Sequence, residues 1–374
     1  MKRIIVSVTN DLVSDNRVHK VCTSLESMGF EILLVGRKLH LSLSIKRTYN
    51  TKRLKLLFNK GWLFYAEYNF RLFLLLLFSK ADIFLANDLD SLFANYLASG
   101  IRKKPLVYDS HEYFTEVPEL IGRKCVHKIW LIIEKKIIPH LKYAYTVCQS
   151  LSDEYYNKYK VHFQVVRNIP MKFSQSSNSQ KNPFPQDKKI IIYQGALNVG
   201  RGIELVIKAT KYFDNVVFAI IGNGDISEQL KELVLKEGVN EKVIFIDKIP
   251  LEELTSYTVC AHLGISLEEN MGLNYYYSLP NKIFDYIQAG VPILASDFPE
   301  IKKIIETYNV GICTSERSPE KLAVIIKNML FDESARIQWK NNLQNTAGKL
   351  CWENEEKVLK SIFEVVIPSI SINE

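Results

Sequence analysis

A lysine and a carboxylate lie three residues apart at the start of a predicted helix, as Lys282 and Asp285 of the segment SLPNKIFDYIQAGVPILAS, residues 278–296. Pro280 suits the first turn, where its missing N–H costs nothing, and Gly290 predicts the end of the helix. A turn of about 100° per residue places Lys282 within about 60° of Asp285 and directs Asp285 away from the apolar face. The two side chains could form an ordinary surface ion pair. They could instead bind a ligand, the lysine neutralising a diphosphate and the carboxylate accepting hydrogen bonds from a ribose.

A second group of interest is Gly200, Arg201 and Gly202, which follows the apolar run KKIIIYQG at residues 188–195. The loop leads into a helical pattern, and the free N–H groups and dipole of a helix start favour a phosphate. An arginine can contact two phosphate oxygens at once. Glycine alone is a weak signal because any turn from a strand to a helix can use it. The spacing is neither GxGxxG nor the P-loop pattern, so only the arginine favours an anion-binding loop.

Short apolar runs alternate with helical patterns along the chain, which predicts parallel sheets covered by helices on both faces. In the first half the expected strands are residues 3–9, 31–37, 82–87, 105–110, 144–150 and 163–168. In the second half they are residues 188–195, 216–224, 242–248, 262–267, 291–296 and 310–315. The fold class is therefore α/β, with two doubly wound parallel sheets.

A segment rich in Ser, Asn, Gln and Pro, residues 171–187, has little to bury and predicts a linker. We expect a Rossmann-like N-terminal, acceptor-binding domain over residues 1–170 and a second Rossmann-like, donor-binding domain over residues 188–350. Residues 351–374 predict a terminal helix that packs back on the first domain. Two such domains in tandem would create a cleft, and ligands of such sheets bind beyond the carboxyl ends of the strands.

Charge is distributed unevenly between the halves. Residues 1–180 hold 27 Lys and Arg against 15 Asp and Glu, whereas the remainder holds 21 against 26. This asymmetry predicts an anionic partner for the first half, such as an anionic membrane surface, unless the lysines only keep the protein soluble. Nucleic acid is not expected, because the sequence has no zinc-finger spacing, RNP-like strand or basic heptad helix.

The uninterrupted apolar run Leu72–Phe78 is much shorter than the roughly 20 residues that span a bilayer. It predicts a buried helix rather than an interfacial anchor. The aromatic and basic segment 52–80 is either a membrane contact or acceptor wall, or a core helix with a solvated lysine edge. The six scattered cysteines contain no CxxC pair, which predicts reduced thiols in a cytoplasmic protein and no metal site.

Taken together, these segments resemble glycosyltransferase family 4, whose members are retaining enzymes of the GT-B architecture. Residues 278–296 resemble the family's nucleotide-sugar signature, in which Pro-x-Lys, an acidic residue and Gly-x-Pro follow one another. The segment YQGALNVGRGIELVIKA, residues 193–209, resembles its diphosphate loop. VYDSHEYFTE, residues 107–116, resembles the histidine segment of its amino-terminal domain, and residues 14–35 resemble its first loop and helix.

The resemblance implies a donor site. It assigns Asp285 to the ribose, Arg201 and Lys282 to the diphosphate, the backbone near Ile249 to the base, and the loop at residues 268–272 to the sugar. The complete implied set is Gly200, Arg201, Gly202, Lys248, Ile249, Glu269, Asn270, Gly272, Leu273, Asn281, Lys282 and Asp285.

The resemblance also implies His111, Arg201 and Lys282 as the catalytic group, with His111 orienting a sugar hydroxyl or supplying charge. Alternatively, His111 only satisfies a strand end. Further candidates for the acceptor or the first loop are Asn16, Arg17, Asp109 and Glu112. Arg17 could equally contact the acceptor or pair with Asp15.

Three departures from the family pattern concern the same site. Glu269 and Asp285 are sixteen residues apart where the family's two acidic residues are eight apart, so residues 274–278 read as an insertion. The arginine that often lies six residues before the diphosphate lysine is replaced by Gly195. The first loop lacks the usual glycines.

The implied activity is transfer of a hexose or related sugar from a nucleotide diphosphate, with retention, to a saccharide or lipid-linked acceptor in cell-surface polysaccharide or glycolipid synthesis. No cofactor and no metal are expected. The expected location is the cytoplasm, with peripheral contact to the cytoplasmic face of the membrane as a further hypothesis. The alternatives are a nucleotide-sugar 2-epimerase of the same architecture and a non-catalytic nucleotide-sugar-binding protein.

Overall fold

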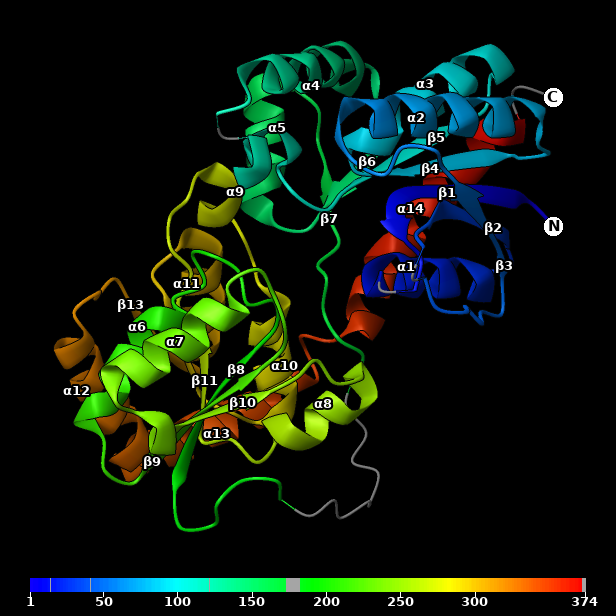
Figure 1. Cartoon of the computed structure of the whole chain (residues 1–374). Coiled ribbons are helices and arrows are strands. Elements are labelled where there is room, and N and C mark those ends of the chain that lie inside the picture. The colour runs from blue at the N-terminus through cyan, green and yellow to red at the C-terminus, as the bar shows by residue number, and fades with distance from the viewer. Residues whose placement is uncertain (14, 41, 121, 173–181, 372–374) are drawn as a thin grey trace. The chain divides into compact units, whose positions relative to one another are not determined.

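The computed structural model describes residues 1–13, 15–40, 42–120, 122–172 and 182–371. These residues divide into two compact units, which we call unit 1 (residues 1–168 with the chain from 355 onward) and unit 2 (residues 169–354). Figure 1 shows each unit as a sheet covered by helices. Much of the predicted linker, residues 173–181, lies outside the described residues.

Unit 1 is built on a seven-stranded parallel sheet with the strand order β3-β2-β1-β4-β5-β6-β7. The buried strands are continuous apolar runs, as expected for a sheet covered on both faces. The strands are β1 (Arg3–Asp11), β2 (Glu31–Lys38), β3 (Asn50–Lys55), β4 (Ile83–Asn87), β5 (Leu106–Ser110), β6 (Tyr143–Thr146) and β7 (Gln164–Val165).

Helices lie on both faces of this sheet (Figure 1), with α2, α3 and α4 side by side over one face and α1 and α14 on the other. Phe30, after α1, packs edge-on against Phe363 of α14, with ring centroids 5.9 Å apart. The helices are α1 (Asn16–Ser27), α2 (Gly61–Phe78), α3 (Leu89–Arg102), α4 (Lys124–Ile137), α5 (Gln149–Tyr159) and α14 (Trp352–Ser371). Short 3₁₀ turns are Phe114–Glu116, Pro118–Leu120 and Ile138–His140.

Unit 2 has a six-stranded parallel sheet with the order β10-β9-β8-β11-β12-β13. Its strands are β8 (Lys189–Gln194), β9 (Val216–Ile221), β10 (Val243–Ile246), β11 (Leu263–Ser266), β12 (Ile293–Ser296) and β13 (Gly311–Thr314). Its helices are α6 (Ile203–Ala209), α7 (Ser227–Glu237), α8 (Leu251–Thr258), α9 (Leu273–Tyr276), α10 (Asn281–Ala289), α11 (Pro299–Tyr308), α12 (Pro319–Phe331) and α13 (Glu333–Ala347). Two 3₁₀ turns are Thr210–Tyr212 and Asn240–Lys242.

The prediction of two doubly wound parallel sheets is confirmed. Strand β3 was missed because its sequence, NTKRLK, is polar and it lies at the sheet edge, where neither face needs a continuous apolar run. The prediction of a buried helix at Leu72–Phe78 is wrong in part. Helix α2 buries one stripe that includes Leu72, but Leu74 and Phe78 are exposed. No helix among the described residues is both long and apolar enough to cross a bilayer.

Candidate active site

Helix α10 has the predicted form: it follows Pro280 and ends at Gly290, which has a φ of 70°. The hypothesis of a surface ion pair between Lys282 and Asp285 is wrong. Lys282 is buried, and its Nζ donates to Glu268 Oε1 at 2.8 Å. Glu268, directly before the predicted Glu269, was not identified from the sequence.

The Lys282–Glu268 pair is charged in spite of its burial. Burial lowers the pKa of Lys282, but the carboxylate of Glu268 outweighs it and the net shift is upward. Burial likewise acts to raise the pKa of Glu268, yet Lys282 and a 2.8 Å hydrogen bond from Ser266 Oγ bring it below its usual value. The ammonium also lies 4.4 Å from the ring centroid of Tyr193, a favourable cation–π distance.

Lys282 lies in the space next to Gly195, the position where the family resemblance leads one to expect an arginine. A Cβ at residue 195 would be 3.7 Å from Lys282 Cε. A side chain at residue 195 would therefore begin in van der Waals contact with the Lys282 side chain.

Two glycines determine the backbone conformation of the loop that contains Arg201. Gly200 and Gly202 have φ values of 78° and 71°, and a Cβ at Gly202 would lie 2.1 Å from the carbonyl oxygen of Leu267. The N–H of Glu269 donates to Gly200 O at 2.9 Å, which joins this loop to the segment after β11.

The Arg201 guanidinium lies over the ring of Tyr275, 5.0 Å from its centroid, and its Nε is buried without a hydrogen-bond partner. The helix that follows Arg201, α6, has only seven residues. Its dipole therefore contributes less positive charge to the loop than the sequence predicted. Aligned peptide dipoles sum along a helix, so positive charge at this loop comes mainly from side chains.

Asp285 belongs to a second polar network at the end of β8. Its Oδ2 accepts from Gln194 Nε2 at 3.1 Å, and Gln194 Oε1 accepts from Thr258 Oγ1 at 2.7 Å. Gln194 was not predicted, although a polar residue that ends an apolar strand was an available signal. Asn281, the first residue of α10, is exposed.

The predicted sugar-loop residues differ from Lys282 in their exposure to solvent. Glu269, Asn270, Gly272 and Leu273 are exposed. Glu269 and Asn270 line a cavity of about 600 Å³ whose wall comes from α6 and the ends of β12 and β13. The predicted insertion at residues 274–278 forms most of the short helix α9.

Lys248 and Ile249 lie in the loop after β10. This strand is at the sheet edge, with β9 between it and β8. Lys248 is exposed, and Ile249 is half-buried against the apolar cluster that contains Ile283 and Ile287.

In unit 1, His111 is surrounded by carboxylates at the carboxyl ends of β4 and β5. Its Nε2 lies 3.0 Å from Asp109 Oδ2 and 3.2 Å from Asn87 Oδ1, and its Nδ1 lies 3.3 Å from Asp88 Oδ2. Burial lowers the pKa of His111, but the charges of Asp109 and Asp88 outweigh it and raise the pKa to about 9. The imidazole is therefore a cation at neutral pH.

The two hypotheses for Arg17 are not supported. Its guanidinium is buried and binds Asp109 through two hydrogen bonds of 2.7 and 3.2 Å, and it also donates to Val166 O. Asp15 instead caps α1 by accepting from the N–H of Val18. Arg17 thus fixes the position of Asp109, and Asp109 in turn fixes the position of the His111 ring.

Of the remaining candidates in unit 1, Asn16 and Glu112 are exposed. Asp88, which sequence reasoning missed, has a φ of 58° and accepts a 2.8 Å hydrogen bond from the His111 N–H. A left-handed backbone at an aspartate is uncommon and often marks a functional site. Among the described residues, no three His, Cys, Asp or Glu side chains are placed to hold a metal ion.

Most of unit 2 matches the model of a known protein family. Residues 174–346, a little under half of the chain, match the family model described as glycosyl transferases group 1. The chain is 24% identical over 186 residues to chitobiosyldiphosphodolichol beta-mannosyltransferase of Candida albicans, covering 47% of this chain and 40% of that protein. It spans less than half the length of the curated relatives it matches.

Solved structures match over both units. Sucrose-phosphate synthase of Thermosynechococcus elongatus superposes with a TM-score of 0.80 at 15% identity, over 99% of this chain and 100% of that one. HepE of Anabaena in complex with UDP-glucose gives a TM-score of 0.70 at 14% identity, over the same shares. At such identities the likeness establishes the fold. Residues 174–346 therefore match glycosyl transferases group 1, within a chain whose two parallel α/β units have the GT-B fold.

Proposed function

We propose that the chain is a glycosyltransferase that moves a hexose or related sugar from a nucleotide diphosphate to a saccharide or lipid-linked acceptor, with retention. The family match of unit 2 and the mannosyltransferase relative support a sugar transfer. The structural neighbour that binds UDP-glucose supports a nucleotide-sugar donor. A role in cell-surface polysaccharide or glycolipid synthesis and a cytoplasmic location remain predictions.

The observation that carries this proposal is the position of Lys282 beside Gly195. This chain has no cation at Gly195, but it has the lysine of the resembled Pro-x-Lys signature, Lys282, on α10. Arg201, in the loop after β8, and Lys282, in the first turn of α10, are then two cations at the carboxyl edge where such sheets bind ligands. Fixed cations at a departing diphosphate lower the barrier because they stabilise the charge that develops there.

The two cations have different roles in this proposal. Glu268 offsets the charge of Lys282 and fixes the position of its ammonium. Arg201 has a buried Nε without a hydrogen-bond partner, which a phosphate oxygen would satisfy. Arg201 is therefore the main source of net positive charge at the diphosphate, and Lys282 is a positioned hydrogen-bond donor.

The other assignments of the donor site follow the resemblance. Asp285, held by Gln194, accepts from the ribose. The backbone at Lys248 and Ile249 pairs with the base, and Glu269, Asn270, Gly272 and Leu273 contact the sugar. No metal or cofactor is required in this proposal, because side chains supply the charge.

His111 acts in this proposal as a fixed cation that donates to a sugar hydroxyl, with Asp109 as its positioning residue. A protonated imidazole is a poor general base at neutral pH. The 2-epimerase alternative needs a general base, so the site favours transfer.

The test is incubation of the purified chain with labelled nucleotide sugars, with and without saccharide and lipid-linked acceptors, in EDTA. We expect acceptor-dependent release of nucleoside diphosphate and a product whose anomeric configuration by NMR matches the donor. Epimerised nucleotide sugar without transfer would support the epimerase, and tight binding without turnover would support a binding protein. An inverted product would refute retention.

A further inference from the structure

Helix α2 is apolar apart from Glu67, Asn69 and Arg71, yet only one side of it is buried. Phe64, Tyr68, Leu72 and Leu76 form the buried stripe, at intervals of four residues. A helix that is apolar on most sides normally buries more than one stripe, in a core or in a membrane. The opposite side of α2 is therefore a surface without an evident role in unit 1.

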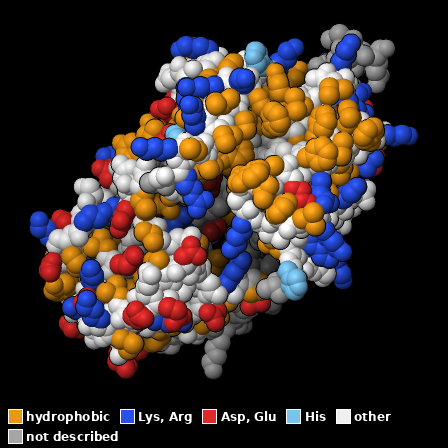
Figure 2. All heavy atoms as spheres, turned by 45° about the horizontal axis from the view of Figure 1, so that its top comes forward, with side chains coloured by type: hydrophobic (Ala, Val, Ile, Leu, Met, Phe, Trp, Pro, Cys, Tyr) orange, Lys and Arg blue, Asp and Glu red, His pale blue; other side chains and the backbone are white. Residues whose placement is uncertain are grey.

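The exposed side of α2 continues onto α3. The α2–α3 apolar face, as we name it, consists of Trp62, Phe70, Leu74 and Phe78 of α2 with Phe93 and Ile101 of α3, all exposed. The two helices pack against each other over the same side of the sheet (Figure 1). Figure 2 shows apolar side chains gathered in a broad area over the top of the molecule, interspersed with Lys and Arg. Contiguous apolar areas of this kind mark interaction sites.

The helices α2, α3 and α4 carry few carboxylates. Each of α2, α3 and α4 has one carboxylate, and each is engaged: Glu67 with Arg71, Asp90 with Thr9, and Glu134 with Lys158. Asp90 and Glu134 are buried. The cations of the three helices are Arg71, Arg102, Lys124, Lys128, Lys135 and Lys136.

Glu67 also shapes the surface. Its carboxylate accepts from the N–H groups of Leu57 and Phe58 at 2.9 to 3.1 Å, which ties the segment before α2 onto the helix. Both residues present their side chains outward, Leu57 at 79% exposure and Phe58 at 43%. The one carboxylate on α2 thus adds two apolar side chains to the exposed surface.

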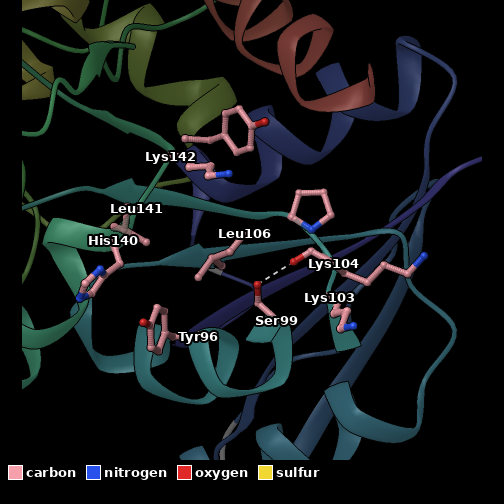
Figure 3. Close-up of a pocket in the computed structure, with 10 residues that line it drawn as sticks. Tyr96, Ser99, Lys103, Lys104, Leu106, His140, Leu141 and Lys142 are labelled. Carbon is pink, nitrogen blue, oxygen red and sulfur yellow. Dashed lines mark hydrogen bonds between the residues drawn. The ribbon is translucent and has the colours of Figure 1, made fainter. Parts of the chain in front are cut away.

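A basic hollow lies where α3 ends and the chain leaves α4 (Figure 3). It has a volume of about 330 Å³ and is lined by Lys103, Lys104, His140 and Lys142. Lys104 is paired with Asp82, whereas Lys103 and Lys142 are exposed. An anionic group next to the end of α3 would meet two lysines there.

We propose that the α2–α3 apolar face docks unit 1 onto an anionic lipid bilayer. Apolar side chains enter the boundary between headgroups and acyl chains, while the cations of α4 and of the basic hollow contact headgroup phosphates. A second copy of the chain is a poorer occupant, because a two-fold contact sets the same patch, with its cations, against itself. The inference goes beyond the proposed function, because it concerns docking and not sugar transfer.

The full chain carries its own reporter for this docking. Trp62 is 71% exposed, whereas Trp130, Trp339 and Trp352 are buried. We expect brominated lipids in vesicles of phosphatidylglycerol and phosphatidylcholine to quench Trp62, and flotation to recover the protein with those vesicles. Both signals should fall with added salt and be at least about tenfold weaker for phosphatidylcholine alone, because part of the attraction is electrostatic.

Two variants test the two parts of the surface. Phe70→Ser, Leu74→Ser and Phe78→Ser together, and Lys128→Glu with Lys135→Glu, should each weaken partition into anionic vesicles about tenfold or more. The matched control replaces three exposed apolar residues of unit 2, Leu235→Ser, Val324→Ser and Ile337→Ser, and should leave partition unchanged. Circular dichroism verifies that each variant is folded.

Three results would overturn the proposal. The first is no association with any vesicle, and the second is an equal loss of partition in the control variant. The third is a dimer, detected by light scattering, in which Trp62 is shielded from acrylamide and which becomes a monomer when Phe70, Leu74 and Phe78 are replaced. Partition is measured without a donor sugar, so its failure is distinguishable from a failure of the proposed transfer.

Discussion

The polar clusters at the carboxyl edges of the two sheets differ in how completely their charges are matched. In unit 1, Asp109 binds both Arg17 and His111, and Asp88 binds the other ring nitrogen of His111. In unit 2, Lys282 is matched by Glu268, but Arg201 has an aromatic ring beneath it and a buried Nε without a partner. The comparison suggests that unit 1 holds a rigid, pre-formed cation, whereas unit 2 has unused capacity for an anion.

The largest expected effect concerns the buried pair of unit 2. Glu268→Ala leaves Lys282 charged and buried, which typically costs about 3–5 kcal/mol. Urea denaturation should report this loss. The matched control is Lys302→Ala, which removes the exposed pair with Asp297 and should change stability little. Equal effects would mean that Lys282 is not held as a buried cation.

Arg201→Ala tests the unused capacity directly. Loss of one preorganised donor to developing charge lowers kcat by roughly 10²–10³. Arg201→Lys should recover part of the activity, because it restores the charge without the forked geometry. A kcat within a few-fold of wild type in the alanine variant would contradict the assignment.

The pre-formed cation of unit 1 predicts a pH dependence of stability. The folded-state pKa of His111 is about 9, above its ordinary value of 6.5. The stabilisation, at most about 3 kcal/mol, is thus fully present below about pH 6.5 and is lost as pH rises through about 9. Unfolding free energies measured from pH 6 to 10 should fall accordingly, and His111→Asn should flatten that part of the profile. A wild-type curve that matches the variant would contradict the network.

The smallest expected effect separates backbone strain from close contact. Gly202→Ala combines a left-handed φ with a Cβ that would lie 2.1 Å from Leu267 O, so a loss of roughly 2–3 kcal/mol is expected. Gly290→Ala has a similar φ and open space around the Cβ, and should cost about 1 kcal/mol. Equal losses in thermal denaturation would show that the two loops are not packed as described.

The sequence predicted the helices and strands that have a recognisable local pattern of residues. Apolar runs identified the buried strands, and Pro280 and Gly290 marked the limits of α10. Strand β3 was not predictable, because an edge strand needs no apolar run. The exposure of one side of α2 was also not predictable, because an apolar pattern does not show how many sides of a helix are covered by other elements.

The sequence predicted which residues belong to the candidate site, but only partly which residues they bind. Lys282, Arg201, Asp285 and His111 lie at the carboxyl edges as expected. Their partners depend on which strands are neighbours: Glu268 follows β11 and Gln194 ends β8, and the sheet order brings these strands together. No spacing along the chain contains that information.

The most direct test of the central claim is isothermal titration calorimetry of a nucleoside diphosphate against the corresponding nucleoside, for wild type and Arg201→Ala. A panel of UDP, GDP and ADP first identifies the base. The account predicts that the alanine variant loses at least about tenfold in affinity for the diphosphate, the loss expected when a charged hydrogen bond is removed, while affinity for the nucleoside is unchanged. Equal diphosphate affinity in the two proteins would contradict the account.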